Sequence, residues 1–298
     1  MKSACLIPLV FLLFLTACGG RSGQSSYPTQ ASKYIQNKGS DTMVNLALAW
    51  AERYQAEHPE VSLSVTGGGS GTGIAALVNG TVDIANASRA VKSEEKQQAV
   101  ANGITPVEFT VARDAIAVIV NPENPVQQLT LQQISDIYSG KFNNWLEVGG
   151  DNRPIVRLSR ETNSGTHVYF LETVLRLGDK TNPTLFSTDT LLLPSSEGII
   201  NEVRQNPNAI GYDGLGYVPS DLMNSVIAVA RDASGPYVIP SIATVNDNSY
   251  PVARDLYMYT AGEPAGAIKD YINWILSSEA QAIVADLGFV PIIPTPSP

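Results

Sequence analysis

The side chains best suited to chemistry are small hydroxyl residues that stand beside glycines in three separate stretches. The stretches are Gly39-Ser40-Asp41-Thr42, the run Gly67 to Gly73 with Ser70, and Arg160 to Thr166 with Ser164. In each, glycine lets the backbone approach a ligand closely, the free N–H groups of a following helix point outward, and the hydroxyls add donors. If the three stretches meet, they form a site for a small oxyanion.

Arg160 is the charged side chain with the most suggestive position. It lies four residues before Ser164, close to an expected helix start. A guanidinium there can hold two oxygens of a tetrahedral anion at once. A surface ion pair is the commoner fate of an arginine, and it stays open as the alternative.

Several enzyme and nucleotide chemistries fit the sequence poorly. A phosphate-binding P-loop needs Lys after its last glycine, but Ile74 follows Gly73. A serine-hydrolase elbow needs glycine two residues on either side of the serine, but Ser70 has Thr72 and Ser164 has Thr162 in those places. Two isolated histidines, His58 on the surface and His167 at the rim of the site, do not suggest a zinc centre. We therefore expect no catalytic residues, no metal and no cofactor.

The overall charge excludes another class of partner. The chain has 298 residues and a net charge of −9, with 16% charged residues and no run of Lys or Arg. The electrostatic footprint of a nucleic-acid-binding protein is therefore missing. Net charge describes the whole surface, so it does not argue against a small anion held in a local site.

The N-terminal segment has the pattern of an export signal. Lys2 precedes an apolar stretch from Leu6 to Ala17, which is too short to span a membrane as a helix. Leu15-Thr16-Ala17-Cys18 resembles the bacterial lipobox, where cleavage leaves a lipidated cysteine. We predict a signal peptide over residues 1–17, lipid on Cys18 and a flexible tether over residues 18–32, rich in Gly, Ser and Gln. The protein is then exported and held to a membrane by lipid.

The body of the chain alternates strand and helix patterns, as α/β folds do. Strands are expected at 33–36, 61–66, 82–85, 115–120, 155–158 and 252–259. Helices are expected at 43–54, after the glycine run through Leu77, at 167–175, near 268–276 and from Ser277 or Ser278 to Gly288. The donor-rich stretches follow strands, and such loops gather at the carboxyl ends of the strands in open α/β sheets. The last residues, Pro294 to Pro298, cannot continue any element.

An ordered set of motifs resembles the phosphate-binding lipoproteins that supply ATP-driven phosphate importers. Together the motifs cover roughly Lys33 to Ile293. They are Gly39-Ser40-Asp41-Thr42-Met43, Gly67-Gly68-Gly69-Ser70-Gly71, Asp83-Ile84-Ala85-Asn86-Ala87-Ser88-Arg89, Ile137-Tyr138-Ser139-Gly140-Lys141 with Trp145, Arg160 with Ser164-Gly165-Thr166, and Ala209-Ile210-Gly211-Tyr212. The resemblance implies that Ser70, Arg160, Ser164, Gly165 and Thr166 contact phosphate and that Ser40, Asp41, Thr42 and Met43 supply the first loop.

One position departs from this family. Some members carry, after the strand that begins at Asp83, an aspartate that accepts the proton of bound phosphate; the matching place here holds Arg89 after Ser88. Sulfate has no proton at neutral pH, so an acceptor carboxylate is how such a site rejects it. Our hypothesis is that Asp41 takes the acceptor role and Ser88 donates, while Arg89 either pairs with a neighbour or touches the anion.

The resemblance implies a two-lobed α/β fold of the type II periplasmic-binding-protein class, with a mixed sheet and flanking helices in each lobe. Residues 33–121 and 250–298 are expected in lobe I and residues 122–249 in lobe II, with the ligand in the cleft between them. The implied function is capture of inorganic phosphate by hinge closure and delivery to an ABC permease, by a monomer that transforms nothing. The alternatives are a binding protein or sensor for sulfate or molybdate and, further away, an exported phosphohydrolase.

Overall fold

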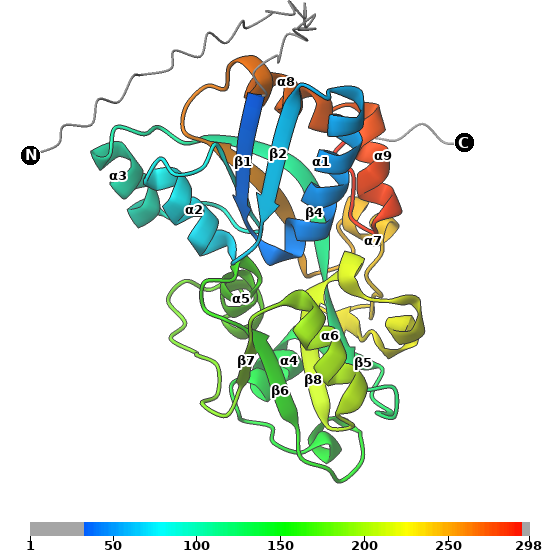
Figure 1. Ribbon diagram of the computed structural model, residues 1–298. Helices are drawn as coiled ribbons and strands as arrows, with labels where there is room; N and C mark the ends of the chain where they lie inside the picture. The colour runs from blue at the N-terminus through cyan, green and yellow to red at the C-terminus, as the bar shows by residue number, and fades with distance from the viewer. Residues whose placement is uncertain (1–32, 294–298) are drawn as a thin grey trace, which may run out of the picture. The chain divides into compact units, whose positions relative to one another are not determined.

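A computed structural model describes residues 33–293, and the predicted signal peptide, the predicted lipidation site Cys18, the predicted tether and residues 294–298 lie outside this range. Strands and helices alternate along the described chain (Figure 1). The strands are β1 (Lys33–Gly39), β2 (Val61–Thr66), β3 (Ile84–Ala87), β4 (Val107–Val120), β5 (Gln128–Thr130), β6 (Val156–Arg160), β7 (Leu191–Leu193), β8 (Ala209–Gly214), β9 (Ala228–Ala230) and β10 (Ala253–Thr260).

Helices connect most of these strands. The α-helices are α1 (Val44–Glu57), α2 (Ser70–Val78), α3 (Ser93–Ala101), α4 (Leu131–Tyr138), α5 (Gly165–Phe170), α6 (Ser196–Gln205), α7 (Ile242–Asn246), α8 (Gly266–Ile275) and α9 (Ser278–Asp286). The short helical turns are η1 (Asp41–Met43), η2 (Trp145–Val148), η3 (Leu171–Leu175, a π-helix), η4 (Leu215–Tyr217) and η5 (Ser220–Ser225). No helix within residues 33–293 is both long and apolar enough to cross a membrane.

Eight strands form one hydrogen-bonded series in the order β2-β1-β3-β10-β4-β8-β6-β7. The first part of β4 pairs with β10 and the last part with β8, both antiparallel, while β1 runs parallel to β2 and β3 and β6 runs parallel to β7 and β8. Below, the first lobe means β1, β2, β3, β10 and the start of β4, with the helices that pack on them. The second lobe means the end of β4, β6, β7 and β8, with the helices that pack on them. The expected two-lobed α/β fold with mixed strand directions is confirmed.

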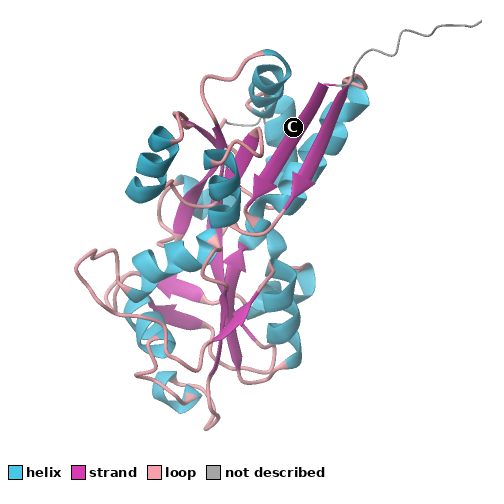
Figure 2. Cartoon of the chain, turned by 60° about the vertical axis from the view of Figure 1, so that its left-hand side comes forward, coloured by secondary structure: helices cyan, strands magenta, loops and turns pink. Residues whose placement is uncertain are grey.

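Each lobe packs helices on both faces of its strands (Figure 2). In the first lobe, Trp50 of α1 and Tyr271 of α8 share a buried cluster on one face, while Leu77 of α2 lies in the cluster on the other face. In β4 the side chains alternate, so Val118 joins the cluster under α4 and α5 and Ile119 joins the cluster under α6. This is the period of two that buries both faces of a central strand.

Element starts near the glycine motifs differ from expectation by a few residues. Helix α2 begins at Ser70, inside the glycine run, because Gly69 adopts a φ of 89° that L residues disfavour and so ends the loop there. Helix α5 begins at Gly165, two residues earlier than expected, because the Ser164 side chain caps it by accepting from Thr166 N at 3.2 Å. Arg160 is the last residue of β6 rather than part of the loop.

The C-terminal helix follows its prediction. Ser277 caps α9 by accepting from Ala280 N, and the turn after the helix contains Gly288 at a φ of 78°. The division between lobes at Asn121 stays a prediction. Residues 116–120, expected to end lobe I, pair with β8, so the strand pairing favours a boundary nearer Ala115.

Candidate functional site

Three serines from separate elements of the first lobe meet at the carboxyl ends of its parallel strands. The Ser40 hydroxyl, in the turn after β1, donates to Ser88 Oγ at 2.9 Å, and Ser70 Oγ, at the start of α2, lies 3.2 Å from Ser88 Oγ. Ser88 N also donates to Ser70 Oγ at 3.0 Å. All three residues are at most 2% exposed. Two of the predicted stretches and the segment after β3 are therefore brought together.

The second lobe supplies the Ser164-Gly165-Thr166 stretch to the same place. Thr166 Oγ1 lies 2.8 Å from Thr42 Oγ1, a hydrogen bond between side chains 124 residues apart. A Cβ on Gly165 would lie closer than 3.0 Å to the hydroxyl oxygens of Ser70 and Ser88. Glycine is thus required at position 165 because a side chain would clash with these hydroxyls. Backbone conformation is not the reason, since the φ of Gly165 is not in the left-handed region.

The glycine run of the first lobe also touches the second lobe directly. Gly71 N donates to Asn163 O at 3.0 Å, and Asn163 Nδ2 donates to Gly68 O at 2.9 Å. A Cβ on Gly69 would lie 2.8 Å from Asn163 O. The glycines of this run therefore allow backbone contact between the lobes, and Asn163 is part of that contact.

Arg160 lies at the centre of these contacts, and its side chain is 0% exposed. Nη1 donates to Ser196 Oγ at 2.9 Å and Asp213 Oδ2 at 3.1 Å, and Nη2 donates to Asp41 Oδ2 and Pro194 O, each at 3.0 Å. Nε completes the set with Leu193 O at 3.4 Å. All five N–H groups of the guanidinium thus have protein acceptors, and an anion reaches Arg160 only by replacing one of them.

Asp41 is the most accessible of the side chains that accept from Arg160. Its side chain is 20% exposed, and its Oδ1 accepts from Gly68 N at 2.8 Å while Oδ2 takes the Arg160 bond. The backbone carbonyl of Asp41 accepts from Tyr217 OH at 2.7 Å. A carboxylate held this way, between a backbone amide and an arginine, can exchange one partner for a ligand without losing both.

Two of the predicted ligand residues have other partners. Arg89 forms a two-pronged ion pair with Glu95, at 2.6 and 2.8 Å, so pairing with a neighbour is the alternative that the structure shows for it. Met43 has a fully buried side chain in the core under α1, and its backbone N donates to Ser40 O at 3.1 Å. Contact of either residue with an anion stays a prediction.

Sequence reasoning missed a second buried arginine behind the threonines. Arg254 of β10 donates from Nη2 to Thr166 Oγ1 at 3.0 Å, to Thr42 Oγ1 at 3.4 Å and to Asp114 Oδ2 at 2.9 Å, and from Nη1 to Ser88 O at 3.0 Å. Burial raises the pKa of Asp114 to about 6, although Arg254 pulls it down. An available signal was Asp114 itself, a carboxylate in an apolar strand, which requires a buried cationic partner.

His167 is not at the rim where we expected it. It is 8% exposed, its Nδ1 lies 3.0 Å from Ser159 Oγ, and its ring stacks on Phe186. Burial lowers its pKa, so desolvation favours the neutral imidazole. Among the residues that the structure describes, no group of three or more His, Cys, Asp or Glu could hold a metal ion.

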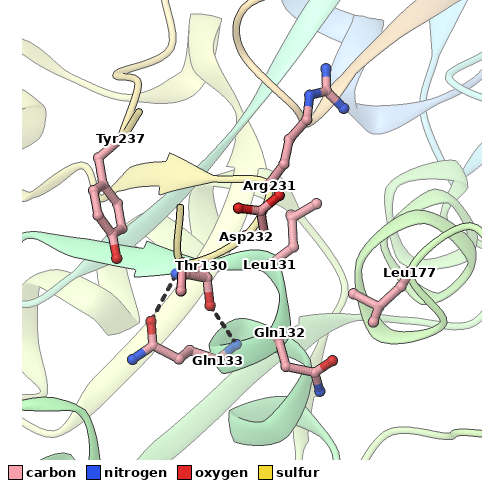
Figure 3. Close-up of a pocket in the computed structure, with 9 residues that line it drawn as sticks. Thr130, Leu131, Gln132, Gln133, Leu177, Arg231, Asp232 and Tyr237 are labelled. Carbon is pink, nitrogen blue, oxygen red and sulfur yellow. Dashed lines mark hydrogen bonds between the residues drawn. The ribbon is translucent and has the colours of Figure 1, made fainter. Parts of the chain in front are cut away.

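Two surface pockets lie away from this cluster. One of about 550 Å³ is lined by Thr130 and Leu131 at the start of α4 and by Tyr237, and Figure 3 shows the Thr130–Gln133 capping bonds among its lining residues. Another is lined by residues 90–94 and by residues of the 172–180 segment. Neither lining includes a predicted ligand residue. The donor cluster is a closed polar contact, since its three serines and Thr166 are at most 2% exposed.

Comparison with known proteins gives a consistent result. A family model for the PBP superfamily domain matches residues 24–279. The phosphate-binding protein PstS of Bacillus subtilis is 31% identical over 96% of this chain and 92% of its own length, and that of Pseudomonas aeruginosa is 30% identical over 87% and 83%. A crystal structure from Clostridium perfringens, assigned as a phosphate ABC transporter substrate-binding protein and solved with bound phosphate, is 34% identical with a TM-score of 0.77, covering 88% of this chain and 100% of that one.

Proposed function

The chain belongs to the phosphate-binding PstS family of the PBP superfamily, and we propose that it binds inorganic phosphate outside the cytoplasmic membrane and delivers it to an ABC permease. The observation that carries the proposal is the cluster of hydroxyls that both lobes build. Ser40, Ser70 and Ser88 from the first lobe and Thr166 from the second lie within hydrogen-bond reach of one another or of Thr42.

These hydroxyls are the donors that an oxyanion needs. Each now bonds to another hydroxyl, and a neutral hydroxyl pair is weaker than a hydroxyl bonded to a charged oxygen. An anion that enters between Ser70, Ser88 and Thr166 would exchange the mutual bonds for charge-assisted ones. The gain is realised only when both lobes contribute, so binding favours the closed arrangement.

The charges around the cluster favour an anion that carries a proton. Arg160 and Arg254 bring two positive charges, whereas Asp41, Asp114 and Asp213 bring three carboxyl groups. Sulfate has no proton at neutral pH, so its oxygens would lie against the carboxylate oxygens of this set without a hydrogen bond between them. Phosphate brings a proton, and Asp41 at the accessible edge is the carboxylate placed to accept it. This supports phosphate over sulfate as the ligand.

Ligand entry has a defined local requirement. Because every N–H of Arg160 is occupied, phosphate contact with this arginine requires that Asp41 Oδ2 leave Nη2 or share it. Asp41 keeps its bond from Gly68 N during that exchange. The same carboxylate then lies beside the bound anion, where it can accept a hydrogen bond from the P–OH group of phosphate. Nothing in this sequence of contacts changes a covalent bond, so we propose a binding protein and not an enzyme.

Calorimetry on the purified protein tests the proposal, with phosphate, sulfate and molybdate titrated separately. Phosphate is expected to bind with a stoichiometry of one, and sulfate to bind much more weakly. Absence of heat and of any thermal stabilisation with phosphate would remove the proposal. Turnover of p-nitrophenyl phosphate by the same sample would replace it with a hydrolase.

Gly165→Ala tests whether lobe contact and binding are one event. The new methyl group would displace the hydroxyls of Ser70 and Ser88, so phosphate affinity should fall by about tenfold or more. Gly262→Ala is the matched control, because a Cβ there meets nothing within 4 Å and its φ is not in the left-handed region. Equal affinity in the two variants would contradict a shared site.

Attachment through Cys18 is a separate part of the proposal. The lipobox-like Leu15-Thr16-Ala17-Cys18 supports a lipid anchor at the start of the mature chain. Cys18→Ala should move the protein from the membrane fraction to the soluble exported fraction without changing phosphate affinity. Retention of the variant in the membrane fraction would exclude this anchor.

A further inference from the structure

Arg254 contacts three of the predicted ligand residues but lies behind them. Its side chain is 3% exposed and reaches Thr42 and Ser88 of the first lobe and Thr166 of the second. It comes from β10, the strand that pairs with β4 up to Ala115, where β4 passes between the lobes. One guanidinium therefore bonds to residues of both lobes at the place where their hydroxyls meet.

The direction of these hydrogen bonds constrains the hydroxyl protons. A guanidinium only donates, so Thr166 Oγ1, at 3.0 Å, and Thr42 Oγ1, at 3.4 Å, both use a lone pair to accept from Nη2. Nη2 has two N–H groups and Asp114 Oδ2 is its third acceptor, so two of the three acceptors share one N–H. The two threonines also share one bond of 2.8 Å, in which one hydroxyl donates to the other. One of the two hydroxyl protons is then left to point away from the guanidinium.

We infer that Arg254 is a positioning residue of the anion site, which turns the lone pairs of Thr42 and Thr166 toward its guanidinium and their protons toward the anion. The inference rests on the proposed function, since it concerns the same site. With an anion between the threonines, both hydroxyls can donate to it while both still accept from Arg254. The site then presents donors only on this side and leaves the acceptor role to Asp41 on the other.

Asp114 holds Arg254 in place. Oδ2 accepts from both Nη2 and Nε of Arg254, and the Asp114 side chain is fully buried. Gly214 of β8 lies against the same carboxylate, because a Cβ there would be 2.9 Å from Oδ2. The ring of Tyr169 covers the guanidinium at 5.6 Å. These contacts fix the orientation of the Arg254 guanidinium. A fixed guanidinium is what the orientation of two hydroxyls requires.

The test is a double-mutant cycle in phosphate affinity. Arg254→Gln is combined with Asp114→Asn so that no unpaired charge is buried, and Thr166→Val removes the hydroxyl at nearly constant shape. The paired substitution should weaken phosphate binding by about tenfold or more, as should Thr166→Val alone. In the variant that combines all three substitutions, the loss of phosphate affinity should be smaller than the product of the two separate losses, because Arg254 acts by orienting the Thr166 hydroxyl.

A control pair separates positioning from general stability. Arg157 is also buried and paired, with Asp189 at 2.9 Å, but its other partners are Ile137 O, Phe142 O and Asn143, none of them a predicted ligand. Arg157→Gln with Asp189→Asn should lower the unfolding midpoint and leave phosphate affinity within about twofold. If the Arg254 pair does not fold, Arg254→Lys takes its place in the cycle, since lysine keeps the charge but lacks the fork.

The outcomes distinguish the inference from its premise. If the unsubstituted protein does not bind phosphate, the proposed function fails and the inference with it. If that protein binds phosphate but the Arg254 substitutions leave phosphate affinity unchanged, Arg254 is only structural and the inference is wrong. The inference is also wrong if the combined variant loses as much affinity as the product of the two separate losses. Non-additive losses with an unchanged Arg157 control support it.

Discussion

Arg160 and Arg254 occupy similar surroundings but make different contacts across the lobes. Their side chains are 0% and 3% exposed, and each is paired with an aspartate, Asp213 or Asp114, whose side chain is 0% exposed. Across the lobes, Arg160 donates to the carboxylate of Asp41, whereas Arg254 donates to the hydroxyl of Thr166 and also to that of Thr42 in its own lobe. In the mechanism that we propose, the first contact competes with an incoming anion, and the second prepares hydroxyls to receive it.

We propose that the two arginines serve the anion site in different ways. Arg160 would bind the anion directly but only after Asp41 moves, so its contribution depends on exchange. Arg254 would keep all its partners and act through the hydroxyls. Removing the first should abolish binding, and removing the second should weaken it. Arg89, whose two terminal nitrogens both donate to Glu95, lies outside this comparison and serves as its reference.

The largest effect is expected at Arg160. Replacing Arg160 by Gln together with Asp213 by Asn removes the charge without leaving a buried carboxylate unpaired. Phosphate affinity should fall by at least about a hundredfold, because charge-assisted bonds contribute about 1.5–3 kcal/mol each. Calorimetry measures the loss. A change below about threefold would show that Arg160 never exchanges Asp41 for the anion.

Asp114, the partner of Arg254, should make the stability of the protein depend on pH. Its pKa, about 6 in the folded protein, is above the ordinary value of 3.8, so the folded state keeps a proton that the unfolded state loses. Its contribution to the free energy of unfolding is therefore greatest at low pH and should fall by about 2 kcal/mol between pH 4.5 and pH 7.

Urea unfolding at the two pH values checks this, with Asp114→Asn as the comparison. The variant has no proton to lose at this position, so its stability should change less steeply with pH than that of the unsubstituted protein. Parallel pH profiles would show that Asp114 keeps its ordinary pKa and that Arg254 compensates fully for its burial.

Asp41→Asn tests the exchange itself. The neutral amide is a weaker acceptor for the phosphate P–OH group, its NH2 group can donate to sulfate, and it binds Arg160 less strongly. Phosphate should therefore lose its advantage over sulfate by about tenfold. Competition between phosphate and sulfate in one titration gives the ratio directly. An unchanged ratio would remove Asp41 from the acceptor role.

The smallest effect is expected at Arg89. Both of its terminal nitrogens donate to Glu95, so Arg89→Gln combined with Glu95→Gln should change phosphate affinity by less than about threefold. The paired change again avoids an unpaired carboxylate. A loss above about tenfold would make Arg89 a ligand and end its use as the reference.

The residues of the candidate site could be recognised in the sequence where they lie in or next to the donor-rich loops, and not where they lie inside strands. The three donor-rich stretches follow β1, β2 and β6, and parallel strands bring such stretches to one edge. Arg160 was recognisable by its place beside one of them. Arg254 and Asp114 are 140 residues apart and meet only because β10 pairs with β4, a long-range register that no local pattern shows.

The occupancy of Arg160 could not be predicted for a related reason. Its acceptors Ser196, Asp213 and Pro194 follow β7 or end β8. They lie more than 30 residues from Arg160 in the sequence, so residue spacing near Arg160 does not reveal them. The fold class was easier, because alternating strand and helix patterns together with motif order constrain it strongly. The starts of α2 and α5 differed by a few residues since Gly69 and Ser164 decide them locally.

A high-resolution crystal structure with phosphate tests the central claim most directly. We predict phosphate oxygens within hydrogen-bond distance of Ser70, Ser88 and Thr166, Asp41 displaced from Arg160 Nη2, and Arg254 still bonded to both threonines. Phosphate bound instead at the Thr130–Tyr237 pocket, or an intact Thr42–Thr166 bond beside an empty cluster in saturating phosphate, would contradict it.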